Sequence, residues 1–292
     1  MRFNLTPGLK TWLLLLAITV VIAGCSRITL AYRNLDVLVS WYLNDYLDLN
    51  SDQQKFLRQQ LGEHLAWHCR AQLPKDLKTL ELVRQQIREG DFDKGAIRNH
   101  YLSMQQAIQS VAVEITPTAV QLLRELDDQQ VGHFAEALAR DHEEHQEKYL
   151  AAPLPQQIRE RAERMSERTE KWTGELNAAQ QQRILTWAHA LGGQNRLWLE
   201  NRRRWQTALL EALSERHSAI FEQRIAQLLQ ARESMESEAY RTALAHNEDA
   251  TLALISDLYA LSDAQQRQYL DNRLRKLSAD LGSLKCLPEA DS

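Results

Sequence analysis

Two short segments carry histidines at a spacing that could bind a metal ion. His64 and His68 stand four residues apart and would share one face of a helix, with Cys69 next to the second. Two such ligands can begin a zinc site, but the sequence offers no third ligand beside them. His142 and His145 stand among acidic residues in RDHEEHQEKY, a pattern that is also typical of a solvated helix end. We therefore assign no metal-binding residue and no cofactor.

The segment RLWLENRRRWQ concentrates arginines and tryptophans. Guanidinium groups bind phosphates and carboxylates through paired hydrogen bonds, so this helix could bind an anionic component such as lipid A or peptidoglycan. Pairing with Glu200 and burial of the tryptophans inside a helical bundle is the alternative interpretation. The candidate anion-binding residues are Arg196, Arg202, Arg203 and Arg204.

The residues of a catalytic centre cannot be assembled from the sequence. Acyl or phosphoryl transfer needs a nucleophile, a base and donors that stabilise developing charge. The chain shows no Ser-His-Asp order, no Gly-rich phosphate loop and no paired carboxylates in an apolar setting. We therefore predict that the protein is not an enzyme and has no catalytic residue. A metal-dependent hydrolase that uses the histidine pairs is the least favoured alternative.

The beginning of the chain has the pattern of a secretory leader. An uncharged stretch follows Lys10 and runs to Gly24, which is shorter than the roughly 20 residues needed to cross a bilayer. It ends in IAGC, which resembles the bacterial lipobox, in which the cysteine thiol receives diacylglycerol. We predict a lipoprotein signal peptide at 1–24 and lipidation of Cys25. A plain cleaved signal peptide and an N-terminal anchor helix are the alternatives.

The predicted lipid determines the expected location of the protein. A lipidated cysteine carries two or three fatty acyl chains, such as palmitate, and two or more chains hold a protein stably on a membrane. Ser26 follows Cys25, in place of the Asp that is associated with inner-membrane retention in enteric bacteria. We therefore expect an outer-membrane lipoprotein that faces the periplasm.

The composition of the remaining chain favours helices. Without 1–24 the chain has 268 residues and a formal net charge of −6, enough length for one large domain or two small ones. The mildly acidic charge argues against nucleic-acid binding. Good helix formers dominate the composition, and runs of alternating β-branched residues are missing. The sequence predicts an all-α protein.

Two cysteines remain after the lipidation site. The oxidising periplasm favours a disulfide between Cys69 and Cys286. This bond would close a loop of more than 200 residues, and loop closure of that length stabilises a fold by roughly 5 kcal/mol in the chain-entropy model. Two unpaired, buried thiols are the alternative.

A short phrase recurs four times, as LNSDQQ, LDDQQ, LNAAQQ and LSDAQQ. In each copy the polar residue after Leu is a good helix N-cap, and a Gln three positions later completes a capping box. Apolar residues at helical spacing follow every copy. The predicted capping pairs are Asn50 with Gln53, Asp127 with Gln130, Asn177 with Gln180, and Ser262 with Gln265.

Proline and glycine residues divide the helical chain. The predicted segments are an N-terminal half 25–150, a linker 151–157 with two prolines, a C-terminal half 158–285 and a tail 286–292. The helix–phrase–helix pattern of 117–134 returns at 249–270, at an offset of 135 residues, which favours an internal duplication. We expect an elongated array of antiparallel helices.

The proline and glycine positions also predict individual helix ends. Pro74 is expected to open a helix that ends at Gly90. A helix over 93–115 is expected to end before Pro117, with a short helix after it. The apolar stripe of 195–231 predicts one continuous long helix.

The segment LAYRNLDVLVSWYLNDYLDLNSDQQ begins five residues after Cys25 and is rich in aromatic residues. Trp41 adjoins one apolar helical face, which consists of Leu35, Leu38, Tyr42 and Tyr46. Packing against later helices would account for such a face by default. A docking surface is the alternative.

The lipobox, this segment and LAWHCRAQLP (65–74) together resemble a family of uncharacterised proteobacterial helical lipoproteins over essentially the whole mature chain. That family has no established activity, so the resemblance implies a helical fold and an envelope location. The four capped phrases are also similar to the L-T-x-x-Q signature of the Spy/CpxP periplasmic stress proteins, of which Spy is a chaperone.

These observations favour a non-enzymatic, lipid-anchored helical protein that acts as a binding or scaffold protein. Its expected partners are the membrane, through the lipid, and an envelope protein or a cell-wall or lipid component. A chaperone-like envelope stress protein is the principal alternative.

Overall fold

The computed structural model describes residue 32 and residues 34–284, and in this part of the chain it contains helices and no strand. The predicted all-α fold is confirmed. Within the same residues, no helix combines the length and apolar character needed to cross a membrane. The predicted signal peptide, Cys25, Cys286 and the tail 286–292 lie outside the described residues.

Short connections join the helices in both halves of the chain. The first half contains α3 (Leu35–Leu47), α4 (Ser51–Trp67), α5 (Leu73–Glu89), α6 (Lys94–Arg124) and α7 (Asp128–Leu150). The second half contains α8 (Leu154–Thr173), α9 (Ala178–Ala190), α10 (Gln194–Ser214), α11 (Phe221–Gln230), α12 (Glu238–Ala260) and α13 (Ala264–Gly282). A π-helical turn, His68–Gln72, joins α4 to α5 directly, so these elements form one rod.

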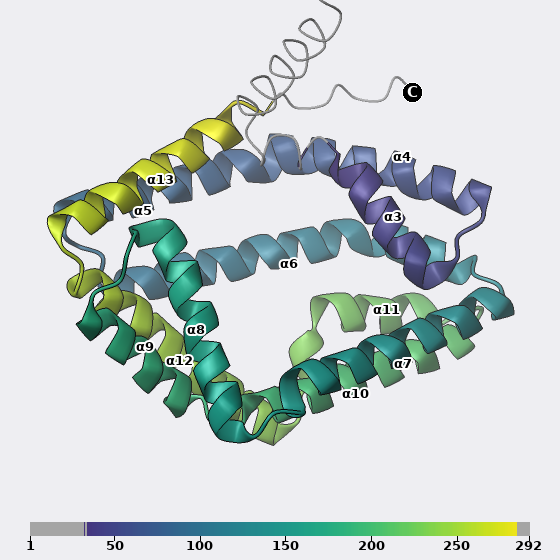
Figure 1. Cartoon of the computed structure of the whole chain (residues 1–292). Coiled ribbons are helices and arrows are strands. Elements are labelled where there is room, and N and C mark those ends of the chain that lie inside the picture. Colours follow the sequence, from purple (N-terminus) through teal and green to yellow (C-terminus); the bar gives the residue numbers. More distant parts are fainter. Residues whose placement is uncertain (1–31, 33, 285–292) are drawn as a thin grey trace, which may run out of the picture.

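The helices form a frame that closes on itself. In Figure 1 the rod of α4 and α5 runs along the upper side, α6 crosses the middle, and α7, α10, α9 and α12 lie below. The last described helix, α13, packs on α5, while α10 packs on α7 and both α11 and α12 pack on α6. The two halves of the chain therefore interlock.

The contacts of the second half repeat those of the first. Helix α3 packs on α4 and α7, and α8 packs in the same way on α9 and α13. Helix α4 packs on α6, and α9 packs on α12. Helix α5, which follows α4, packs on α13, and α10, which follows α9, packs on α7. This correspondence supports the internal duplication, which stays a prediction, with α11 as an additional helix in the second half.

The predicted linker 151–157 is mostly helical. The residues between α7 and α8 are Ala151 to Pro153. Pro155 lies in the first turn of α8, where a missing amide hydrogen costs no intrahelical hydrogen bond. A short turn between α7 and α8 therefore connects the two halves of the chain.

The prediction of one helix over 195–231 is wrong, because the chain turns after Ser214. The turn buries Arg216, whose Nε donates to the carbonyl of Leu126 at 2.7 Å. It also returns Phe221 to the same core as Leu213, and both side chains are fully buried. No glycine or proline lies between Ser214 and Phe221. The position of the turn follows from the burial of α10 and α11 in one core.

The predicted helix end before Pro117 is also wrong, because α6 continues through this residue. Proline lacks the amide that would bond the carbonyl four residues earlier. Buried residues on both sides, Thr116 and Thr118, pack α6 against its neighbours, and Gln230 of α11 donates to the Thr116 hydroxyl at 2.9 Å. Tertiary packing therefore keeps the helix intact. The predicted end at Gly90 is confirmed, with a φ of 85° there.

Capping boxes begin the four helices that follow the repeated phrases. The confirmed boxes are Asn50 with Gln53, Asp127 with Gln130, and Asn177 with Gln180. The prediction of Ser262 with Gln265 is wrong by one residue, because the fourth box pairs Asp263 with Gln266. The hydroxyl of Ser262 instead donates to the carbonyl of Leu258 at 2.7 Å, which extends the end of α12.

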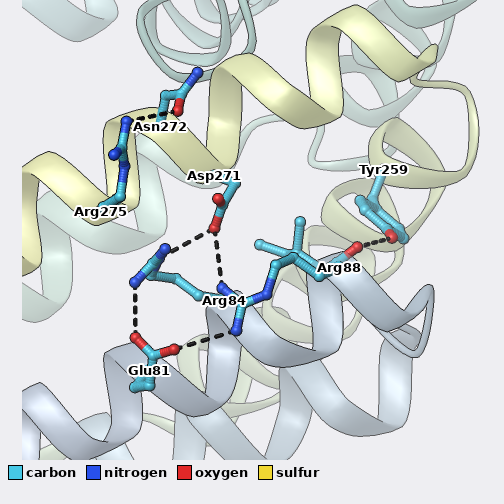
Figure 2. A network of polar contacts seen from close by, with 8 residues as sticks. Glu81, Arg84, Arg88, Tyr259, Asp271, Asn272 and Arg275 are labelled. Atoms are coloured by element: carbon cyan, nitrogen blue, oxygen red, sulfur yellow. Dashed lines mark hydrogen bonds and ion pairs between the residues drawn. The ribbon is translucent and has the colours of Figure 1, made fainter.

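Ion pairs clasp α5 to α13, as Figure 2 shows. Arg84 donates from Nε to Asp271 at 3.1 Å and from its terminal nitrogen to Glu81 at 2.7 Å. Next to this pair, the Tyr259 hydroxyl donates to the carbonyl of Ile87 at 2.8 Å. The corner between α12 and α13 is thus fastened to the end of α5.

Candidate functional site

The four capping-box glutamines meet in two buried pairs. Gln53 and Gln130 donate to each other's side-chain oxygens at 3.1 and 2.7 Å. Gln180 and Gln266 do the same at 3.2 and 3.0 Å. All four side chains are buried. The repeated phrase therefore builds two matching joints between distant helices.

Each glutamine also closes the end of a neighbouring helix. Gln53 donates to the carbonyl of Glu125, and Gln130 donates to the carbonyl of Asp48, at 3.0 and 2.8 Å. In the second joint, Gln266 donates to the carbonyl of Glu175 at 2.7 Å. These bonds satisfy carbonyls that a helix end leaves without partners. The role of the phrase is structural.

The first histidine pair is occupied by protein partners. His64 contacts Glu114 through Nδ1 at 3.2 Å and Thr118 through Nε2 at 2.8 Å. Nδ1 of His68 lies 3.1 Å from the Tyr32 hydroxyl. These contacts tie α4 to α6 and to the start of the described chain.

The second histidine pair lies at the interface of α7 and α10. His145 bonds the carbonyl of Asp141 at 2.6 Å. His142 is buried, and this burial, with Arg203 nearby, lowers the pKa of its imidazole below the usual value. Across the described residues, no group of three or more His, Cys, Asp or Glu side chains is arranged to hold a metal ion.

The four candidate arginines do not converge on one site. Arg202 donates a hydrogen bond to the carboxylate of Asp141 in α7 at 2.5 Å. Arg203 and Arg204 line a shallow surface depression together with two glutamates. Arg196 is exposed one turn or more before them on the same helix. Binding of an anion by this segment stays a prediction.

Cys69 is disulfide-bonded and buried. It packs in a small cluster with Leu73 and Leu284, and Leu284 stands two residues before Cys286. Cys286 lies outside the described residues, so the predicted pairing of Cys69 with Cys286 stays a prediction, which this cluster supports.

Helix α3 presents an apolar face to solvent. Its inner side packs through Ser40 and Leu47 on α4 and α7. The exposed fractions on the outer side are 37% for Leu35, 56% for Val37, 50% for Leu38, 66% for Trp41 and 56% for Tyr42. Packing therefore accounts for one side of this helix, and the outer side is a candidate docking surface.

A large hollow lies between α6, α10 and α12. It has a volume of about 800 Å³. Its walls are mainly apolar, and six aromatic rings line it: Phe92, Tyr101, Tyr149, Trp187, Trp198 and Tyr240. Tyr149 and Trp198 pack edge to face with ring centroids 5.6 Å apart, which fixes one wall. We call this hollow the aromatic pocket.

A small number of polar groups enter the aromatic pocket. The Tyr101 hydroxyl donates to the carboxylate of Glu248 and accepts a hydrogen bond from Gln105 at 2.9 Å. Burial and the adjacent Glu248 raise the pKa of Tyr101 to about 12, so its hydroxyl stays protonated. Asn247 donates to Gln194 at 2.7 Å across the α10–α12 contact. The pocket thus offers an apolar wall with one fixed carboxylate.

The imidazole of His100 also lines the aromatic pocket. It lies 2.6 Å from the side-chain oxygen of Gln86. Burial lowers the pKa of His100, which favours the neutral ring at pH 7. The group therefore contributes hydrogen-bonding capacity and no net charge.

A family model matches residues 45–241, which is most of the described chain. Its description is a family of unknown function, DUF6279. The chain belongs to this family. No curated protein and no solved structure matches it. Resemblance to a family without an assigned function is thereby confirmed, while likeness to proteobacterial lipoproteins and to Spy/CpxP proteins stays a prediction.

The DUF6279 match includes three of the four capping boxes and ends inside α12, at the edge of the aromatic pocket. The pocket was not predicted from the sequence, because its rings come from five separate segments. A signal was present in α12, where pocket residues recur every three or four positions. These residues are Tyr240, Leu244, Asn247, Glu248, Thr251 and Ile255.

Proposed function

We propose that this DUF6279 protein is a lipid-anchored, non-enzymatic protein of the bacterial cell envelope that binds an apolar ligand in the aromatic pocket. The observation that carries this proposal is the pocket itself. Its volume of about 800 Å³ falls in the range of small-molecule sites, and such sites combine apolar walls with few polar groups. The walls come mainly from α6, α10 and α12, and the packing of α12 on both other helices preforms the site.

The outer face of α3 supports the anchored placement. Leu35 stands ten residues after Cys25, so an extended chain of that length reaches at most about 35 Å from the lipid. The exposed rings of Trp41 and Tyr42 are the residue types that favour a membrane–water interface. We assign a lipid surface as the partner of this face, on the periplasmic side of the outer membrane.

The pocket is tested by filling it. Ala243 lines the pocket, and Ala245 is an exposed residue on the same helix. Ala243→Trp is expected to weaken binding of a neutral solvatochromic dye at least about tenfold, because the indole occupies the ligand volume. Ala245→Trp is the matched control and should leave the affinity unchanged. Equal affinity in both variants would remove the pocket from the proposal.

The anchor is tested on the protein made in cells. Mass spectrometry of the mature N-terminal peptide is expected to show acylated Cys25. The Cys25→Ser variant should accumulate as an unprocessed precursor, because the thiol that accepts the lipid is missing. An unmodified N-terminus at another residue of the native protein would overturn the lipid anchor.

The membrane contact of α3 is tested by spin labels on the lipidated protein in phospholipid vesicles. Val37→Cys places a label on the outer face, and Gln182→Cys places one on the exposed side of α9. Because Cys69 is already disulfide-bonded, the label selects the new thiol. Oxygen accessibility should rise at position 37 and stay low at position 182. Spin–spin broadening at position 37 would instead indicate a second copy of the chain.

A second candidate function, holding unfolded envelope proteins without ATP, is favoured by the middle of α6. Four large apolar side chains there are about half exposed or more: Leu102, Met104, Ile108 and Val113. Such a row can bind apolar segments of an unfolded chain. The protein should then delay the aggregation of several unrelated clients, and Ile108→Ser should weaken this effect. Failure with every client would exclude this function.

A further inference from the structure

The charge of the aromatic pocket is asymmetric. Among the described residues that line it, no Lys or Arg is present, and Glu248 is the one acidic side chain. The nearby cations are already engaged on the outside of α12. Lys94 and Arg98 of α6 each lie 2.8 Å from Asp249, next to Glu248. Within the described part of the chain, no ion pair joins Glu248 to a Lys or Arg. Arg232, which lies near Tyr240, is placed over the ring of Trp205 outside the pocket lining.

Two tyrosines lie near this carboxylate. Tyr101 donates to one of its oxygens and carries a ring into the pocket. Tyr240 lies close enough that Glu248 contributes to raising its pKa, after burial and Glu236, so this hydroxyl is also protonated. Arg241, on the same turn as Tyr240, donates to the Glu236 carbonyl at 3.3 Å. The rings are thus neutral, and their faces carry the negative side of the aromatic quadrupole.

A cation with an apolar body complements this arrangement. A carboxylate and ring faces both attract positive charge, and the remaining apolar wall fits a hydrocarbon chain or ring. An anionic ligand would be repelled by Glu248, and a neutral one would bury the carboxylate without compensating its charge. We propose that the aromatic pocket selects cationic amphiphiles, with the ligand's amine or ammonium group at Glu248 and its apolar body against Trp187 and Trp198. This inference rests on the proposed function of the pocket.

The test compares three probes with one apolar chain and different head groups: decyltrimethylammonium, decanol and decyl sulfate. Binding to the full chain is measured by calorimetry at concentrations below micelle formation. The cationic probe is expected to bind about tenfold more tightly than decanol, and decyl sulfate should bind most weakly. Higher salt should reduce the preference for the cation partially, because the pair is partly shielded from solvent.

Glu248→Gln separates charge from shape. The amide retains a hydrogen-bond acceptor for Tyr101, so the wall is kept while the charge is removed. This variant should bind decanol as the native protein does and lose most of the preference for decyltrimethylammonium. Asp249→Asn, on the adjacent position and paired with Lys94, is the matched control and should keep the preference.

The outcomes distinguish the two levels of the proposal. Binding of decanol without any preference for the cation, or a preference that survives Glu248→Gln, would overturn the cationic ligand class and leave an apolar pocket. Failure of all three probes to bind, together with no effect of Ala243→Trp, would overturn the pocket as the ligand site. Circular dichroism of each variant checks that the helices are intact.

Discussion

The two glutamine joints use the same bonds in different surroundings. In each joint, two buried side-chain amides donate to each other and to the carbonyl of a helix end. The first joint adjoins a core that joins α3, α4, α6, α7, α10 and α11, whereas the second adjoins a core of α8, α9 and α12. The glutamine bonds therefore join the helix ends in the same way in both halves, whereas the apolar cores around them contain different sets of helices.

The divergence is concentrated in α11. This helix supplies Phe221, Ile225 and Leu228 to the core around the first joint. Its preceding turn sends Arg216 to the carbonyl of Leu126 and to Asp128, beside the second capping box. No equivalent helix stands between α5 and α6, where the chain turns at Gly90. An added element in one half thus completes the core of the other.

Substitutions of the joint glutamines are expected to have the largest effects on stability, and these effects should be similar in the two joints. Gln180→Ala should lower the free energy of unfolding by about 3 kcal/mol, because the capping box is lost and Gln266 is left without its partner. Gln53→Ala should lower the free energy of unfolding by a similar amount, since Gln130 loses its hydrogen bonds with Gln53. Urea unfolding followed by circular dichroism gives both values.

A double-mutant cycle sharpens this result. Gln180→Ala combined with Gln266→Ala should cost about 1 kcal/mol less than the sum of the single changes, because the two groups share bonds. Gln182→Ala, on the exposed side of α9, is the control and should change stability by less than about 0.5 kcal/mol. Strict additivity would mean that the two glutamines act only as separate caps.

Substitution of Arg216 tests how much the turn before α11 contributes to stability. Arg216→Met should destabilise the protein by about 2 kcal/mol, because the Leu126 carbonyl loses a buried donor at 2.7 Å. Arg224 on α11, whose partner Glu215 lies 2.9 Å away at the surface, is the matched control. Arg224→Met should have almost no effect. Equal losses in chemical denaturation would contradict the role assigned to the turn.

The two matching interfaces, α5 with α13 and α7 with α10, are each crossed by an ion pair. Asp271→Asn and Asp141→Asn should each cost about 1 kcal/mol, since each carboxylate is partly buried and bonded by an arginine of the facing helix. Asp257→Asn, at a half-exposed pair with Arg183, should cost less than about 0.5 kcal/mol. Thermal unfolding of the three variants ranks them. A larger loss at Asp257 would invalidate the ranking by burial.

The smallest expected difference is one of acid sensitivity. The hydrogen bond from Arg216 holds the pKa of Asp128 below its ordinary value of 3.8. A depressed folded-state pKa contributes stability above about pH 4, and this contribution is lost as the pH falls through the lower, folded-state value. Asp128→Asn should therefore flatten the acid limb of the stability curve. An unchanged limb between about pH 4 and 2 would show that this carboxylate does not participate.

Local signals in the sequence predicted the helix starts. The capping residues Asn50, Asp127 and Asn177 were identified because a cap and its glutamine lie three residues apart. The fourth box was misplaced by one residue since Ser262 and Asp263 are both good caps, and the choice depends on where α12 ends. Such signals fix where helices begin, and they do not indicate which helices meet.

Long-range packing decided the features that the sequence did not predict. Pro117 is held inside α6 by contacts with α11, and the turn before Phe221 follows from burial in a shared core. Glu248 was not singled out because an isolated carboxylate on a polar helix face is ordinary. Its setting depends on Tyr101, which lies far away in sequence and across the α6–α12 contact. The pairing of Gln53 with Gln130 is nonlocal in the same way.

The clasp between α5 and α13 has a consequence for the order in which the chain can finish folding. The partner of α5 is α13, the most C-terminal of the described helices, and the core around the first joint also requires α10 and α11. Contacts so distant in sequence form slowly, because a long loop must close before they can. A chain in which α13 has not yet formed therefore leaves α5 without its packing partner. Shortening α13 would therefore first destabilise the rod of α4 and α5, which lies near the start of the described chain.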